Sequence, residues 1–212
     1  AHAEELGCDY WAITDHSKAV SVANGMDEKR LLNQIKVIDE LNGRMKNFRT
    51  LKGIEVDILG DGRLDMPDKV LKQLDMVIAS VHSKFHLSLE EQTKRVLKAL
   101  KNPYLKILGH PTGRLLQKRE PIALDMERIV RACKVYKKAM EINASPSRLD
   151  LNDIHARMAK DSGVKMVIDT DSHHYTQFEF IKYGIFIARR AWIRKEDVLN
   201  TRPVEKLLNF WT

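Results

Sequence analysis

The chain has 212 residues, of which 43% are hydrophobic and 31% are charged. This composition is that of one folded domain over residues 1–212, and it excludes disordered, collagen-like and coiled-coil chains. The net charge of +7 suits an anionic partner such as nucleic acid, although charge alone does not identify one. Two isolated cysteines, Cys8 and Cys133, exclude a thiolate zinc site and fit a reducing cytoplasm. No apolar run approaches the roughly 20 residues that span a bilayer, so we expect no membrane partner.

Short apolar runs alternate with longer stretches of helical period, which is the pattern of repeated βα units around a parallel sheet. The predicted strands are Tyr10–Thr14, Leu51–Asp57, Met76–Val81, Leu105–Gly109, Ala139–Ile142 and Val164–Asp169. The predicted helices are Asp27–Lys46, Pro67–Leu74, Leu89–Leu100, Asp125–Tyr136, Asn152–Asp161, Phe178–Arg190 and Pro203–Phe210. Asp27 and Ser88 are predicted N-caps. Periodicity alone leaves open whether the sheet closes into a barrel or stays open and doubly wound.

Histidines and carboxylates recur where the predicted strands end. They are His16, Glu55, His82, His110, Asp171 and His173. One histidine at a strand end is usually an ordinary loop residue, but the carboxyl ends of strands in a parallel barrel meet at one face, so the coincidence predicts a shared cavity. Imidazole and carboxylate ligands without thiolates suit Zn, Mn or Fe, and more than four ligands indicate more than one ion. Such sites activate water and clamp phosphoryl groups, which points to phosphoester hydrolysis.

Six segments resemble successive motifs of the PHP (polymerase and histidinol phosphatase) superfamily. They are Ala12–Ser17, Gly53–Leu59, Ile78–Ser83, Leu108–Arg114, Glu141–Ala144 and Thr170–His174. Three further segments resemble the C-terminal domain of bacterial family X DNA polymerases, namely Gly113–Leu116, Arg148–Leu151 and Arg189–Thr201. The resemblance covers essentially the whole chain.

The resemblance implies an α/β fold, specifically a distorted (β/α)7 TIM-like barrel that holds up to three Mn or Zn ions. It implies that His82 and His110 hold one ion and that Glu55 bridges it to a second ion, which Asp171 also binds. His16 and His173 would belong to a third ion. The catalytic set would be Glu55, His82, His110 and Asp171. The implied activity is that of a 3′–5′ exonuclease or related DNA-end phosphoesterase, joined to a polymerase core in the parent protein.

Several polar residues near these motifs have predicted secondary roles. Arg114 and Arg148 follow metal-motif strands and are candidates for contact with the DNA backbone, with a surface salt bridge as the alternative. His174 is expected to face away from His173 in an extended segment, or else to donate a hydrogen bond to phosphate. Asp15 is expected to orient a ligating histidine.

Other polar residues are interpreted as structural. His86 lies four residues beyond His82, but this spacing makes a ligand pair only on a helix, and His82 ends a strand. His155 has no partner and is expected on the surface of a helix. Asp57 and Asp65 are interpreted as structural or distant from the phosphate.

The sequence departs from the family pattern at its start. The family begins with an HxH pair on its opening strand, followed by a further His or Asp ligand, and this chain has neither. Ala1–Gly7 is interpreted as the end of the helix after that strand, with Gly7 as C-cap, so the first βα unit is expected to be missing. Glu55, His82 and His110 would then form the one ion site with all its protein ligands, and we expect fewer ions and slow turnover.

Two other functions remain open at this point. One is a free-standing small-molecule phosphatase of the histidinol-phosphatase type, and the other is a degenerate, non-catalytic DNA-binding or structural module. The basic charge and the polymerase-like segments favour the DNA-end phosphoesterase.

Overall fold

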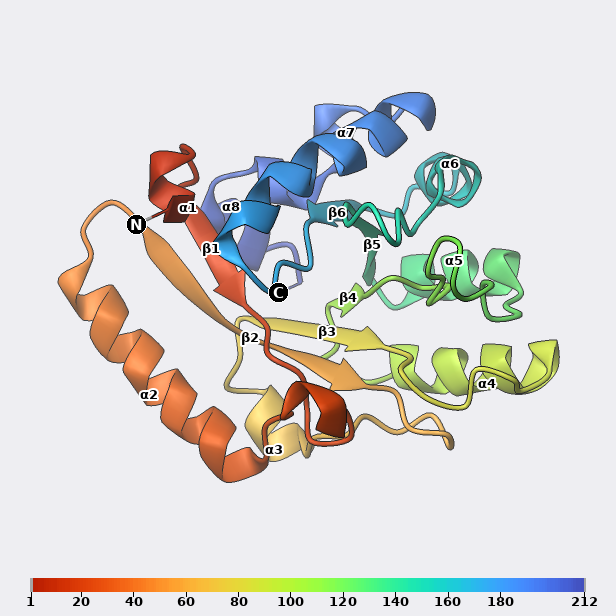
Figure 1. The fold of residues 1–212 in the computed structure, drawn as a ribbon, viewed down its shortest axis with the longest axis horizontal. Helices are drawn as coiled ribbons and strands as arrows, with labels where there is room; N and C mark the ends of the chain where they lie inside the picture. The colour runs from red at the N-terminus through yellow and green to blue at the C-terminus, as the bar shows by residue number, and fades with distance from the viewer. Residues whose placement is uncertain (1, 212) are drawn as a thin grey trace.

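The computed structural model describes residues 2–211 and contains one sheet of six parallel strands (Figure 1). The strands are β1 (Tyr10–Ile13), β2 (Arg49–Asp57), β3 (Met76–Ser80), β4 (Ile107–Leu108), β5 (Ala139–Asn143) and β6 (Met166–Asp169). They lie in chain order, so every connection crosses over from one parallel strand to its neighbour. The sheet curls into a half-barrel with helices along its outside, which is consistent with a TIM-like fold.

The helices match the periodic segments of the sequence. They are α1 (His2–Glu5), α2 (Glu28–Arg44), α3 (Asp68–Leu71), α4 (Leu89–Leu100), α5 (Met126–Val135), α6 (Asp153–Asp161), α7 (Ile181–Arg190) and α8 (Val204–Leu208). The predicted strand Leu105–Gly109 is shorter in the structure, and the start of the predicted helix Phe178–Arg190 belongs to a 3₁₀ helix, η2 (Tyr175–Phe180). The described residues thus contain the six predicted strands, and a seventh stays a prediction.

Caps fix where several helices begin. The Asp27 carboxylate accepts from the Arg30 amide at 2.8 Å, and Ser88 forms a capping box with Glu91. Both N-caps are therefore confirmed. At the start of the chain, Gly7 has a φ of +79° and follows α1, as predicted for a C-cap, while Ala1 lies outside the described residues.

The two faces of the sheet are buried against different partners. One face, which includes Ile54, Val56 and Val77, packs in the core formed with the outer helices. The opposite face begins with apolar residues that pack against the C-terminal segment and α8, namely Leu51, Met76, Ile78, Ile107, Ala139 and Val167. Further along the strands this same face becomes polar, because side chains alternate with a period of two and Glu55 follows Leu51 in phase. On this face, polar groups therefore lie at the carboxyl ends of the strands, beyond the apolar residues that pack against α8.

The C-terminal segment also covers a sheet edge. The Asn200 side-chain amide pairs with both backbone groups of Ile168, accepting from its N–H at 3.1 Å and donating to its carbonyl at 2.6 Å. The Tyr10 hydroxyl donates to the Arg202 carbonyl at 2.9 Å and ties β1 to the same segment. In residues 2–211, no helix is long and apolar enough to cross a membrane.

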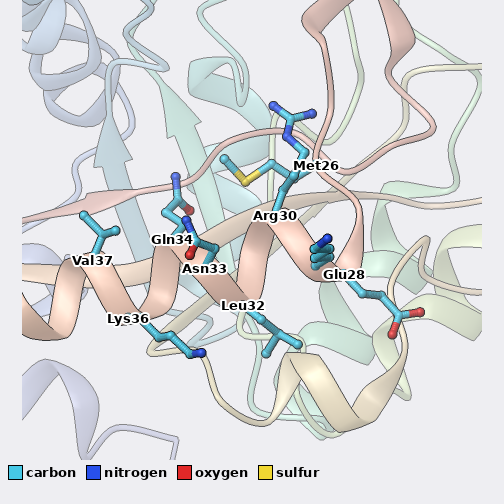
Figure 2. Close-up of a pocket in the computed structure, with 9 residues that line it drawn as sticks. Met26, Glu28, Arg30, Leu32, Asn33, Gln34, Lys36 and Val37 are labelled. Carbon is cyan, nitrogen blue, oxygen red and sulfur yellow. The ribbon is translucent and has the colours of Figure 1, made fainter.

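A hollow in the described structure lies along α2 (Figure 2). It has a volume of about 1050 Å³ and is open, and its lining includes Met26, Arg30, Leu32 and Val37. None of the predicted site residues lines it, so we locate the candidate site at the strand ends instead.

Candidate metal centre

A single buried carboxylate, Glu55, lies between three histidines. The Glu55 side chain is nearly inaccessible, and its Oε1 is 2.8 Å from His110 Nε2 and 3.2 Å from His82 Nε2. Its other oxygen, Oε2, is 3.3 Å from His16 Nδ1. Ligand atoms of His16, Glu55 and His82 all lie within 4.8 Å of one another. The structure thus brings together four of the residues that the sequence indicated as ligands.

The strand register explains this convergence. Glu55 belongs to β2, while His82 and His110 follow the ends of the next two strands, β3 and β4, by two residues each. His16 lies beyond β1, where its pairing with Glu55 continues the parallel ladder. The Glu55 amide donates to the Asp15 carbonyl at 3.0 Å, and the Glu55 carbonyl accepts from the Ser17 amide at 3.0 Å. His16 is therefore fixed beside Glu55 by backbone pairing.

Several imidazole nitrogens in this cluster are buried without an aligned hydrogen bond. Among the described residues these are His16 Nδ1, both ring nitrogens of His82, and His110 Nδ1. Buried polar atoms without partners are costly, and two of these nitrogens, His16 Nδ1 and His82 Nε2, face the Glu55 carboxylate, which calls for a ligand there. A divalent cation that accepts mixed imidazole and carboxylate ligands would satisfy those two nitrogens, with Zn and Mn both suited to the donors. The residues present therefore fit the metal ions that the resemblance implies.

The charges of the cluster are strongly coupled. Burial raises the pKa of Glu55, but the hydrogen bond with His110, the close contact of His82 and the charges of both rings outweigh it and hold the pKa well below its ordinary value. Burial lowers the pKa of His82, but contacts with Asp57 and Glu55 dominate and raise it to about 9. For His16, burial dominates and lowers the pKa. Glu55 is accordingly an anion throughout the neutral range.

A second group of polar residues lies beside this cluster, after β5 and β6. The Asp171 carboxylate accepts from Asn143 Nδ2 at 3.2 Å and lies 3.3 Å from Arg148 Nε. The His173 ring contacts the Asp171 backbone carbonyl at 2.9 Å, and its centroid is 6.0 Å from that of His16. His173 therefore lies next to the histidine cluster. The Asp171 carboxylate contacts Asn143 of β5 and Arg148 of the following loop, and its Oδ1 also lies 3.9 Å from His173 Nδ1.

The predicted phosphate-binding residues have different surroundings. Arg114 is committed to its own protein, because its guanidinium donates to the Arg148 carbonyl at 2.7 Å and also to the Leu149 carbonyl. Arg148 forms its ion pair with Asp171 inside the site and not at a remote surface, and its Nη1 is buried without a hydrogen-bond partner in the described residues. His174 is exposed and its Nδ1 lies 2.9 Å from the Thr176 hydroxyl.

Two minor predictions are wrong. Asp15 does not orient a histidine, because alternation along the extended chain sends it away from His16, and it is exposed and accepts from Gln34 Nε2 at 2.6 Å. His155 is partly buried and not a surface residue, since the first turn of α6 packs near Asp150, and burial lowers the pKa of its ring. His86 and Asp65, both interpreted as structural from the sequence, have other surroundings. His86 is exposed, and the Asp65 carboxylate accepts a hydrogen bond from the Ala19 amide at 2.6 Å.

Sequence reasoning missed a buried acidic pair behind the histidines. Glu141 accepts a hydrogen bond from the His110 amide, and it lies beside Asp169. Burial and the neighbouring Asp169 charge raise the pKa of Glu141 well above its ordinary value, and burial raises the pKa of Asp169 to about 6. The sequence held a signal for Glu141, because Glu141 and Asn143 lie two residues apart in β5 and so share the sheet face that carries Glu55 in β2.

Comparison with known proteins shows which family the chain belongs to. The sequence is 43% identical over 204 residues to the DNA polymerase/3′-5′ exonuclease PolX of Bacillus subtilis strain 168, covering 96% of this chain and 36% of that protein. It is 32% identical over 209 residues to a "probable phosphatase" of Thermoanaerobacter sp. strain X514, covering 94% of this chain and 80% of the relative. The chain belongs to this phosphatase family. A "probable phosphatase" of Caldanaerobacter subterraneus is 36% identical over 214 residues, covering 96% of this chain and 79% of the relative.

The chain is therefore a PHP-like domain related to PolX, with a function of the phosphoesterase type in general. It spans about a third of the length of the Bacillus subtilis protein. No protein-family model matches the PHP-like chain.

Proposed function

We propose that the PHP-like domain is a metal-dependent phosphoesterase that trims the 3′ ends of DNA and is joined to a polymerase core in its parent protein. The observation that carries this proposal is the contact of one buried carboxylate, Glu55, with ring nitrogens of His16, His82 and His110. Mn or Zn ions bound there would supply charge neutralisation at the phosphoryl group and lower the pKa of a bound water.

Each residue of the cluster has a role in this proposal. His82 and His110 would hold a first ion together with Glu55, and Glu55 and Asp171 would hold a second. His16 and His173 would hold a third. The depressed pKa of Glu55 supports its role, because an anionic carboxylate is available to bind cations at all neutral pH values.

Side chains at the edge of the site, chiefly the positively charged Arg148, would hold the phosphate of the substrate. Arg148 supports this, since it lies beside Asp171 and its Nη1 has no hydrogen-bond partner among the described residues. A guanidinium there would hold a phosphate oxygen. Arg114 would act indirectly by fixing the Arg148 loop, and the exposed His174 would donate to the phosphate. The net charge of +7 and the 43% identity to PolX support DNA as the anion.

A second candidate is hydrolysis of a small phosphomonoester. The relatives named as probable phosphatases favour it, because this chain covers 80% of one and 79% of another. A third outcome is a degenerate module that binds DNA without catalysis.

One comparison of substrates tests these candidates. The protein would be incubated with Mn²⁺ and either a 3′-labelled oligonucleotide or p-nitrophenyl phosphate, beside the variants Glu55→Gln and Asp65→Asn. Trimming of the oligonucleotide that is lost in Glu55→Gln and kept in Asp65→Asn supports the exonuclease. Hydrolysis of the monoester alone supports the small-molecule phosphatase, and DNA binding without cleavage of either substrate supports the module.

A further inference from the structure

We infer that Asp57 is a positioning residue that sets the orientation of the His82 ring in the metal centre. The inference rests on the proposed function, and it extends it by assigning a role to a carboxylate that the sequence motifs left as structural. Asp57 is almost fully buried, so its charge must be compensated from within the protein.

The His82 imidazole lies between two carboxylates. Asp57 Oδ1 accepts from the His82 backbone amide at 2.9 Å and lies 3.3 Å from the ring Nδ1. On the other side of the ring, Nε2 lies 3.2 Å from Glu55 Oε1. Each ring nitrogen thus faces a different carboxylate. Only Glu55 is shared with the other histidines.

Asp57 is itself held rigidly. Its amide donates to Ser17 Oγ at 3.0 Å, and its carbonyl accepts from the Asp65 amide at 3.0 Å. Its position in β2 is paired with Ser80 of β3, two residues before His82. Asp57 and Glu55 also lie two residues apart on one strand, so their side chains share a face. Strand β2 therefore carries the proposed ligand Glu55 and, two residues later, the carboxylate of Asp57 that contacts His82.

This arrangement suits a histidine that binds through Nε2. A ligating imidazole commonly donates its other N–H to a carboxylate, which fixes the tautomer and the ring orientation and strengthens the ligand. Hydrogen bonds of this kind are often long until a site is assembled, which agrees with the 3.3 Å separation. Asp57 would accept a hydrogen bond from the Nδ1–H group and leave the Nε2 lone pair, on the Glu55 side of the ring, free to bind an ion.

Zn²⁺ affinity, measured by competition with a chromogenic chelator, tests the inference without any assay of activity. Asp57→Asn keeps the size of the side chain and an acceptor for the His82 amide but removes the charge, and we expect it to weaken Zn²⁺ binding about 10- to 100-fold. The matched control is Asp65→Asn, a buried carboxylate of the following loop that contacts the Ala19 amide and no histidine. It should bind Zn²⁺ as the wild type does.

The outcomes separate this inference from the proposed function. If the wild type binds no Zn²⁺, the proposed function fails and the role of Asp57 fails with it. If the wild type binds Zn²⁺ and Glu55→Gln does not, but Asp57→Asn matches the wild type, only the role of Asp57 is overturned. An equal loss in Asp57→Asn and Asp65→Asn also overturns it.

A measurement on the wild type decides the question if Asp57→Asn does not fold. In ¹⁵N NMR spectra of the Zn²⁺-loaded protein, His82 should carry an exchange-protected proton on Nδ1 and bind the ion through Nε2. Binding through Nδ1 would overturn the inference.

Discussion

Raising the pH in the presence of a chelator should destabilise the protein through His82. Contacts with Asp57 and Glu55 outweigh burial and raise the pKa of this ring from 6.5 to about 9, and its side chain is only 14% exposed. A group with a raised pKa in the folded state stabilises the fold fully below pH 6.5, and this stabilisation is lost as the pH rises through about 9. The interval between the two values corresponds to about 3 kcal/mol.

Urea unfolding at a series of pH values between about 6 and 9.5, with EDTA present, measures this effect. The control is His82→Gln, because other groups titrate in part of the same range. Burial lowers the pKa of Lys138 to about 8, so this lysine adds stability as the pH rises from 8 toward 10.5, in both proteins alike. The difference between wild type and variant should therefore shrink by about 3 kcal/mol across the window. A difference that stays constant with pH would show that His82 does not titrate with a raised pKa in the folded protein.

Three further predictions concern the loops, a helix cap and the substrate. Arg95→Met should lower the free energy of unfolding by about 3 kcal/mol or more. The reason is that the buried Arg95 guanidinium donates to backbone carbonyls in the loops after β2 and β3, including that of Ser83 at 2.8 Å. Urea unfolding measures the change, and an unchanged midpoint would contradict this prediction. Ser88→Ala should cost about 1 kcal/mol through loss of the capping box with Glu91 and leave Zn²⁺ affinity unchanged, which a chelator competition checks. Arg148→Ala should raise the KM for an oligonucleotide about tenfold or more and reduce its salt dependence, and equal kinetics in both proteins would show that Arg148 does not bind phosphate.

The fold and the centre of the site could be predicted because they follow from simple periodicities. Alternating apolar and helical segments predict parallel strands, and the carboxyl ends of such strands meet at one face. Glu55, His82 and His110 follow directly from this rule, since each lies within two residues of the end of one of three consecutive strands. His16 required only that β1 continue its pairing beyond its last regular residue.

The supporting contacts could not be predicted, since they depend on register and loop conformation. Asp57 reaches His82 only because β2 and β3 pair with Asp57 opposite Ser80, and no local pattern fixes that register. The pairing of Arg148 with Asp171 joins two loops that follow different strands. The prediction for Asp15 failed although a local pattern was available. Side chains alternate along an extended chain, so Asp15 points away from His16, whereas the prediction rested on the motif alone.

The metal content of the purified protein shows whether Glu55 and its histidines bind metal ions. The wild type and Glu55→Gln would be dialysed against Mn²⁺ or Zn²⁺, washed, and measured by elemental analysis, with circular dichroism to confirm that both are folded. We expect at least one ion per wild-type chain and a loss of bound metal in the variant, because Glu55 is the carboxylate that three histidines share. A folded wild type without metal, or a variant with the same metal content, would contradict it.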